Sequence, residues 1–415
     1  MTWIRFLKEY YMENYHYLCF YRRLISKHSI FFDTPNYYRS RTIRVQRITK
    51  RFLFTLFIAS YYNFFFGSSC IWPELVEENV YWIVVEFLPK SQQFHFTLTV
   101  LTWCNANLLV LLALPNFLSE FCFLSVFDLY RKDSIKLLGL NQEKLSELKH
   151  FKRTIFEPYS PITNFVTDVT ALIAILVIIL TKQLWSKNWL VCLIHLILTS
   201  AWIHLNTSTN FGLAPYLWQT SFYLKLKQEI VIEKMISLEK RLRKNLTRTT
   251  FNPNRIGKEF IEFCLKNSRI NAEIFAYNRE FRFLYTILFV DHIQNTTYIT
   301  YLLFFAEFTS FFFLYVIFYI LIFFILLSTI YHASLLITYN KQISELTYRI
   351  CYLITKSERL ESIRLKRFQT IAINRVPNNL IGFRLVNDFL VNNLAYYEVY
   401  YMVSVFFFLI LRKKK

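Results

Sequence analysis

The sequence predicts an all-α, polytopic membrane protein with seven transmembrane helices, an inner N-terminus and long cytoplasmic helical extensions. Hydrophobic residues make up 54% of the 415, and 44 Phe and 28 Tyr stand against only 5 Gly. Several apolar stretches reach the roughly 20 residues that a helix needs to cross a bilayer. Basic stretches alternate with these apolar ones, and the longest basic stretch carries apolar residues at helical spacing. Together these observations favour a helical membrane bundle with basic connections.

Residues 1–51 are expected to form a cytoplasmic N-terminal segment. They are rich in Arg and Lys beside the first apolar stretch, and such residues accumulate on the cytoplasmic side of membrane proteins. The net charge of +20 has the same explanation, because the basic residues do not form the single face typical of nucleic-acid binding. We therefore expect membrane lipid and no nucleic acid among the partners.

Residues 52–215 are expected to hold transmembrane helices 1–4 with their loops. The apolar stretches that predict these helices lie at about 52–72, 94–118, 162–181 and 189–205. The inner loop between the second and third has a helical pattern near Leu145–Phe156. The short polar stretch Lys182–Lys187 predicts a tight outer loop before the fourth helix.

Residues 216–297 are expected to form cytoplasmic amphipathic helices that lead into helix 5. Apolar residues recur there at helical spacing between Lys and Arg: Val231, Met235, Leu238 and Leu242. Asn252-Pro253-Asn254 predicts a break between two helices. We favour extensions of membrane helices that pack on one another; a helix lying on anionic lipid is the alternative.

The C-terminal part is expected to contain three more transmembrane helices. Residues 298–337 form one apolar block about twice as long as a span, which predicts helices 5 and 6 with a turn near Glu307–Ser310. The basic residues 338–379 predict a cytoplasmic anchor segment. Residues 380–415 predict the pore-lining helix 7 and a short tail. An inner N-terminus and seven spans place the C-terminus outside the cell, in the plasma membrane.

The sequence carries no pattern for catalysis, metal or cofactor binding. Motifs of the common hydrolases, metalloproteases, nucleotide-binding loops and calcium loops are missing. The seven Cys are scattered without a metal-binding or disulfide spacing. We expect neither an enzyme nor a resident cofactor or metal.

Polar residues in the outer halves of the predicted helices indicate a small-molecule pocket. Such residues cost free energy inside a membrane unless they are paired or line a site. Ordinary hydrogen bonding between helices is the alternative for each of them. The candidates are His95, Trp103, Asn105, His195, Thr199, Glu307, Ser310, Tyr315 and Tyr319.

The last helix contains the carboxylate of Glu398, which is costly against lipid and easily tolerated beside water. This favours a helix with one face exposed to water, although pairing with another helix explains the carboxylate equally well.

The order of these elements resembles the insect gustatory and odorant receptor superfamily. Gustatory members carry Thr-Tyr, five hydrophobic residues and Gln-Phe in the last helix. Tyr401 and Phe408 match this motif at the same spacing, while Tyr400 replaces the Thr and Phe407 replaces the Gln. Upstream, Gly382-Phe383 resembles the start of the same helix in that family.

The resemblance implies a chemosensory, ligand-gated, non-selective cation channel built from four subunits, identical or related, around the last helix. It implies a small-molecule ligand in an outer pocket and a pore face of Tyr400, Ser404, Phe407 and Leu411 at helical spacing. A Phe ring in place of the Gln narrows the pore and favours dewetting, which makes Phe407 the candidate gate.

Three other kinds of protein remain open at this point. A seven-helix G-protein-coupled receptor needs an outer N-terminus, which the basic residues 1–51 oppose. A secondary transporter is usually built from repeats with Gly- or Pro-broken spans, and neither is visible. A non-conducting membrane scaffold is the third.

Overall fold

The fold is built from long helices, which form almost all of the regular structure in the described residues of this computed structural model. These residues are 53–54, 56–61, 63–64, 139–156, 165, 168–169, 172, 182–245, 253–305, 312–356, 381–385, 390–391 and 395–412. Within some of the helices only the backbone is described. Beyond the helices, this part of the chain contains one isolated antiparallel β-bridge, between Arg384 and Leu390. The predicted all-α class is therefore confirmed.

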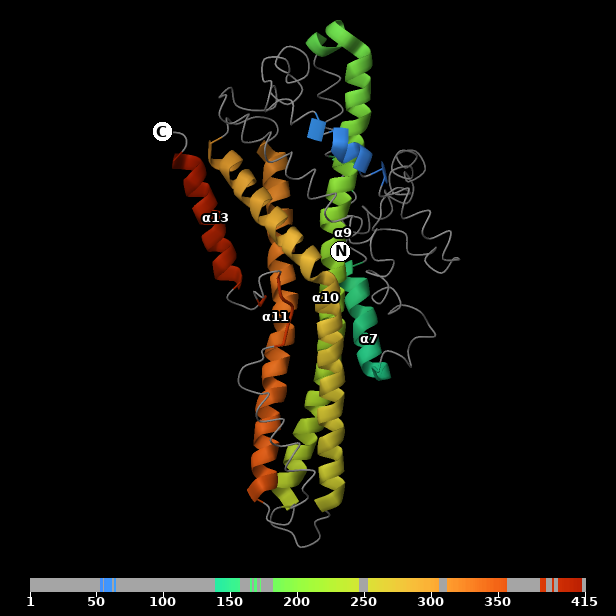
Figure 1. Ribbon diagram of the computed structural model, residues 1–415, viewed down its shortest axis with the longest axis vertical. Coiled ribbons are helices and arrows are strands. Elements are labelled where there is room, and N and C mark those ends of the chain that lie inside the picture. The colour runs from blue at the N-terminus through green and yellow to red at the C-terminus, as the bar shows by residue number, and fades with distance from the viewer. Residues whose placement is uncertain are drawn as a thin grey trace, which may run out of the picture.

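Three helices run most of the length of the molecule: α9 (Lys182–Asn245), α10 (Pro253–Phe305) and α11 (Phe312–Lys356). At 1.5 Å per residue α9 is about 96 Å long, three times the roughly 30 Å hydrocarbon layer. Figure 1 shows the lower parts of all three side by side, with α10 antiparallel to α9 and α11. Each helix is thus long enough to cross a membrane at its upper end and to continue beyond it.

The three helices pack through apolar seams that repeat every seven residues. On α11 the buried positions are spaced alternately by four and three: Ile322, Leu326, Thr329, Ala333, Leu336, Asn340, Ile343, Thr347, Ile350 and Ile354. On α9 the same spacing gives Leu217, Ser221, Leu224, Gln228, Val231, Met235, Leu238 and Leu242. This 3.5-residue period is the pattern of a left-handed coiled coil, in which a narrow seam faces the partner helices along the whole contact. These helices therefore pack on one another, while their role as cytoplasmic extensions of membrane helices stays a prediction.

Helix boundaries follow the local sequence in one place and differ from expectation in another. The break between α9 and α10 is confirmed, and Pro253 occupies the first position of α10, where a missing N–H costs nothing. The turn expected near Glu307–Ser310 falls among residues 306–311, between α10 and α11 and outside the described residues. Lys182–Lys187, expected as a loop, is helical instead and forms the start of α9. A short polar stretch that contains no Gly or Pro does not have to interrupt a helix.

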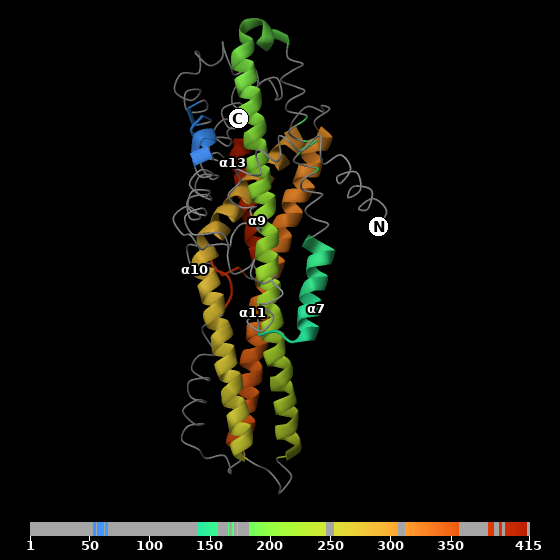
Figure 2. The ribbon, with the colours of Figure 1, turned by 90° about the vertical axis from the view of Figure 1, so that its right-hand side faces the viewer.

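Two shorter helices lie against the long ones. α7 (Gln142–Phe151), continued by a π-helical turn η2 (Lys152–Phe156), packs on α9, as Figure 2 shows. It matches the helical pattern predicted near Leu145–Phe156. α13 (Ala395–Arg412) packs on the upper part of α10 and touches α11. Within the described residues, the segment Ile320–Thr355 is long and apolar enough to cross a membrane.

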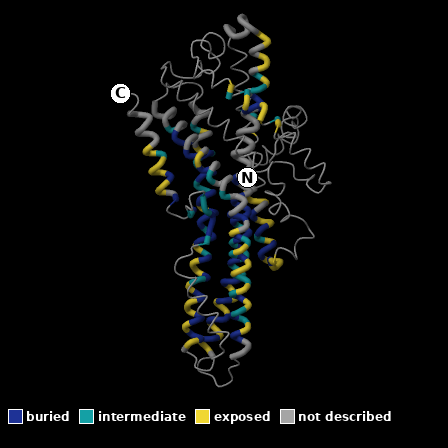
Figure 3. Tube along the Cα trace, viewed as in Figure 1, coloured by how far each residue is buried: buried dark blue, intermediate teal, exposed yellow. Residues whose placement is uncertain are grey.

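A single apolar core joins all these helices. Figure 3 shows buried residues concentrated where the long helices face one another. The core includes the seams of α9, α10 and α11, the inner face of α7, and the first turns of α13 through Ala395 and Val399. α13 is therefore attached to the long helices by apolar contact at its N-terminal end.

The seam predicts a contrast between two leucines in the lower part of the molecule. Leu238 is fully buried on α9, whereas Leu265 on α10 is 47% exposed. We expect Leu238→Ala to lower the free energy of unfolding by about 3 kcal/mol, because it leaves a cavity in the seam. Leu265→Ala is expected to change it by less than about 1 kcal/mol. Thermal unfolding of the detergent-solubilised protein measures both, and equal shifts would contradict the seam.

Candidate functional site

The candidate site is α13, because it carries the predicted pore residues. One stripe of this helix faces the core: Ala395 is 1% and Val399 is 4% exposed, and Val403 packs partly against the same core. The other described side chains of α13 are exposed: Tyr397, Glu398, Tyr400, Tyr401, Met402, Ser404 and Val405. Over the described side chains of α13, the single chain therefore covers this stripe and leaves the other faces exposed.

The predicted pore face lies next to the attached stripe. The ring of Tyr400 makes an edge-on contact with Phe323 of α11 at a centroid distance of 5.7 Å, and Tyr400 is 49% exposed. The hydroxyl of Ser404 donates a hydrogen bond of 2.8 Å to the carbonyl oxygen of Tyr400. Phe407, Phe408 and Leu411 lie on α13, and their side chains are outside the described part of the structure.

A second arc of α13 points farther from the core than the predicted face does. At about 100° per residue, Tyr397 and Tyr401 lie opposite the Ala395–Val399 stripe. Their exposed fractions, 74% and 71%, are larger than that of Tyr400. Ser404 lies between the two arcs, so it belongs to either face.

The predicted ligand-pocket residues are only partly placed. His195 and Thr199 lie on the upper part of α9, and Tyr315 and Tyr319 lie near the start of α11, as backbone positions whose side chains are not described. The others fall outside the described residues: His95, Trp103, Asn105, Glu307 and Ser310. The pocket stays a prediction.

The sequence predicts that the last helix starts at residue 380, but α13 starts at Ala395, and the described residues 381–385 and 390–391 before it are not helical. An antiparallel β-bridge between Arg384 and Leu390 forms there instead. We call residues 381–391 the strap; of these, 381–385 and 390–391 are described. Phe383 and Val391 are fully buried, and the Val391 N–H donates to the Phe383 carbonyl oxygen at 2.9 Å. The strap thus folds back on itself immediately before α13 begins.

Two side chains of α10 bind the backbone of the strap. The N–H of Arg384 donates to Oδ1 of Asn278 at 2.9 Å, and Nε of Arg282 donates to the Leu385 carbonyl oxygen at 2.7 Å. On the other side the strap approaches α11 closely, since a Cβ at Gly382 would lie 2.5 Å from Cγ1 of Ile337. Glycine is therefore required at this contact, which fixes the strap between α10 and α11.

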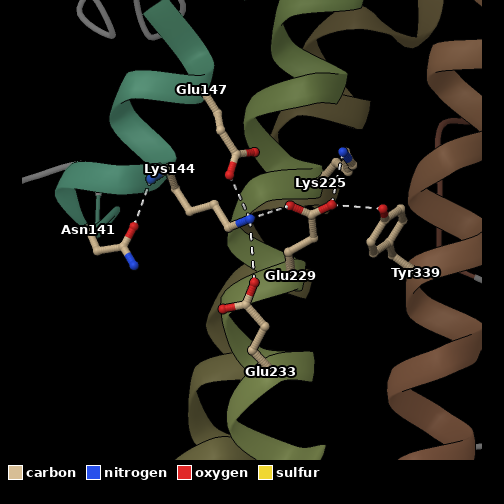
Figure 4. Close-up of polar contacts among 7 residues, drawn as sticks. All are labelled: Asn141, Lys144, Glu147, Lys225, Glu229, Glu233 and Tyr339. Carbon is tan, nitrogen blue, oxygen red and sulfur yellow. Dashed lines mark hydrogen bonds and ion pairs between the residues drawn. The ribbon is translucent and has the colours of Figure 1, made fainter.

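A buried ionic network holds α7 on α9, at a height between the upper and lower parts of the long helices. Figure 4 shows Nζ of Lys144, 7% exposed, among three carboxylates: Glu147 at 2.9 Å, Glu229 at 3.0 Å and Glu233 at 3.4 Å. Glu229 also accepts from Lys225 at 2.9 Å and from the Tyr339 hydroxyl of α11 at 2.7 Å. One carboxylate therefore links three helices.

The network shifts the ionisation of its members. Burial by itself lowers the pKa of Lys144, but hydrogen bonds to Glu147 and Glu229 and the charge of these carboxylates outweigh it, so the pKa is raised. Burial by itself raises the pKa of Glu229, but hydrogen bonds from Lys225, Tyr339 and Lys144 outweigh it, so the pKa is lowered. Both groups are therefore charged at neutral pH.

The structures most informative about this arrangement are those of the insect olfactory receptor OR5 from Machilis hrabei. The structure in complex with eugenol has a TM-score of 0.54 to this chain and 11% sequence identity, covering 97% of this chain and 99% of that one. The structure described without eugenol also has a TM-score of 0.54, with 10% identity over 96% and 99% of the two chains. No protein-family model and no curated protein matches the sequence. The chain therefore shares the fold of this insect olfactory receptor over 97% of its residues.

The ionic network predicts a pH-dependent attachment of α7. Lys144→Met leaves the carboxylates without their buried partner, so we expect it to destabilise the protein by about 2 kcal/mol and to speed hydrogen exchange in α7. Lys149→Met, at an exposed position of the same helix, is the matched control and is expected to change neither.

The stability difference between wild type and Lys144→Met is expected to depend on pH in a defined range. The raised pKa of Lys144 makes its contribution full below the ordinary value of 10.5 and lost at higher pH. The lowered pKa of Glu229 makes its contribution full above 4.5 and lost at lower pH. Thermal unfolding is expected to show a constant difference between wild type and Lys144→Met from about pH 5 to 10. No difference at pH 7 would contradict the network.

Proposed function

We propose that this chain, which shares the fold of an insect olfactory receptor, is a chemosensory receptor that acts as a ligand-gated, non-selective cation channel of the gustatory-receptor type. The likeness covers nearly all of both chains, so it supports the complete receptor architecture rather than one shared helical hairpin. Tyr401 and Phe408, at the spacing of the gustatory motif, support the gustatory branch.

The observation that carries the proposal is the one-sided attachment of α13. Among its described side chains only Ala395 and Val399 are buried, while three tyrosines and a glutamate are exposed. A lone lipid-facing helix would place Glu398 and Ser404 in hydrocarbon at a cost of free energy. When several copies surround a central axis, the same side chains face water or a neighbouring subunit. We therefore assign α13 to the lining of a pore.

The assembly that fits this assignment is a tetramer of identical or related subunits. The chain lies in the plasma membrane with seven spans, a cytoplasmic N-terminus and an extracellular C-terminus. The antiparallel course of α9, α10 and α11 supports this orientation, because it brings the basic lower ends of all three helices to one side. Their long seams then form a cytoplasmic anchor below the membrane.

The ligand is a small organic molecule that binds in the outer half of the helices. One of the two similar structures is a complex with eugenol, which makes eugenol a reasonable first probe. His195, Thr199, Tyr315 and Tyr319 lie on the upper parts of α9 and α11 and offer aromatic and polar side chains for such a site. Binding opens the channel only to the extent that the ligand prefers the open state.

The gate that we propose is Phe407. Four copies of this ring at one level of the pore form a hydrophobic constriction, which empties of water and blocks ions when it is narrow enough. Tyr400, Ser404 and Leu411 line the pore on the same face at intervals of about one and two turns.

We expect Phe407→Ser to raise the basal current several-fold without added ligand, because a small hydroxyl side chain keeps the constriction wet. Phe408→Ser, one residue further along and about 100° around the helix, is the matched control and is expected to leave the basal current unchanged. Whole-cell recording measures both, with surface expression and tetramer size checked for each variant.

A raised basal current in Phe408→Ser and an unchanged current in Phe407→Ser would contradict Phe407 as the gate. This result would indicate that the arc of Tyr397 and Tyr401 faces the pore. An unchanged current in both variants, with tetramers at the cell surface, would contradict a hydrophobic gate on α13.

A further inference from the structure

The strap is held to α10 through its backbone. Asn278 accepts from the Arg384 N–H, and Arg282 donates to the neighbouring Leu385 carbonyl oxygen. Backbone groups removed from water need such partners, and these two cannot obtain them from a regular sheet. Asn278 and Arg282 therefore hold the strap through its backbone.

The two hydrogen bonds add directionality that the apolar contacts lack. Phe383 and Val391 are fully buried, but apolar packing alone tolerates small sliding and rotation. Asn278 and Arg282 are one helical turn apart, so together they fix both the height and the direction of the strap along α10. The close approach of Gly382 to Ile337 fixes its distance from α11.

α13 begins only four residues after Val391, and its first residue, Ala395, is already buried. The strap is therefore joined to the buried first turn of α13 by a short stretch of chain. We propose that Asn278 and Arg282 are positioning residues of α13, which tie the start of this helix to α10.

This tie gives the outer helices a way to act on α13. α10 continues from Asn278 and Arg282 through its upper part to Phe305, beside α13. A displacement of α10 relative to α11 therefore moves the strap and, with it, the first turn of α13. The gating role of the tie rests on the proposed channel function, whereas the positioning role does not.

The test uses the full-length protein and measures where α13 lies without relying on current. Phe323 of α11 and Tyr400 of α13 are in ring contact, so cysteines at these two positions report the observed placement of α13. The Phe323→Cys/Tyr400→Cys chain is treated with a short bifunctional thiol reagent. Cross-linked peptides are counted by mass spectrometry, and the parent with its seven native cysteines serves as the blank.

Variants at the tie are then compared in this background. Asn278→Leu removes the acceptor and is expected to slow cross-linking on the order of ten-fold, the effect of one lost hydrogen bond. Asn278→Asp keeps an acceptor oxygen and is expected to restore the wild-type rate. Arg282→Met removes the donor at similar length and is expected to act like Asn278→Leu.

Asn271→Ala is the matched control on the same helix. Asn271 lies two turns before Asn278, and its Oδ1 has no hydrogen-bond partner in the part of the chain that the structure describes. This variant is expected to cross-link at the wild-type rate. An equal loss in Asn271→Ala and Asn278→Leu, or no loss in either tie variant, would overturn the proposal. A cysteine pair that does not cross-link in the otherwise wild-type chain would overturn it as well.

Current adds a second, separable readout. In chains without the added cysteines, Asn278→Leu is expected to change the fraction of time that the channel is open, with single-channel conductance and reversal potential unchanged. Slowed cross-linking with unaltered gating would overturn the gating role of the tie. Absence of current from the wild type would contradict the proposed function, and the cross-linking result would still decide the positioning role.

Discussion

The structure depends on the continuous seams that join α9, α10 and α11. Because the apolar positions repeat every 3.5 residues, each helix keeps one side toward its partners over many turns without losing register. Exposed apolar residues such as Trp189 and Ile320 occur on the described upper parts of these helices, and exposed basic residues such as Arg241 occur on the lower parts. Polar residues within the seams, such as Gln228 and Asn340, limit the registers that the helices can adopt, because they are buried among apolar neighbours.

α7 and α13 are placed by this bundle in different ways. α7 is tied by charge, with Lys144 surrounded by carboxylates of α7 and α9 and linked through Glu229 to Tyr339 of α11. α13 is held by apolar contact at its first turns, and the strap before it is held by hydrogen bonds between its backbone and two side chains of α10. A helix whose described contacts lie at its first turns is suited to a moving part, since few of these contacts must change when it shifts.

Much of this fold is predictable from the sequence, because the spacing of apolar residues predicts the helices and helix-breaking residues predict where they end. Val231, Met235, Leu238 and Leu242 show the spacing of the α9 seam, and Pro253 marks the start of α10. The helical pattern near Leu145–Phe156 likewise predicts α7. The strap is not predictable in this way, because its hydrogen bonds to α10 use backbone groups, and the periodicity of side chains gives no information about these. From the sequence alone, Lys144 is expected to be a solvent-exposed basic residue of an inner loop. Its contact with Glu229 arises only from tertiary packing, because the two residues are far apart in the sequence.

The central claim is that α13 lines a water-filled path for ions. Ser404→Cys tests it most directly, because this position lies between the two exposed arcs and belongs to the pore face in either arrangement. A small, charged, water-soluble thiol reagent is applied to the channel under voltage clamp, with Val399→Cys as the control, since Val399 is 4% exposed and faces the core. The claim predicts a progressive, irreversible loss of current in Ser404→Cys and no change in Val399→Cys or wild type. Unaltered current in a fully modified Ser404→Cys channel would contradict it.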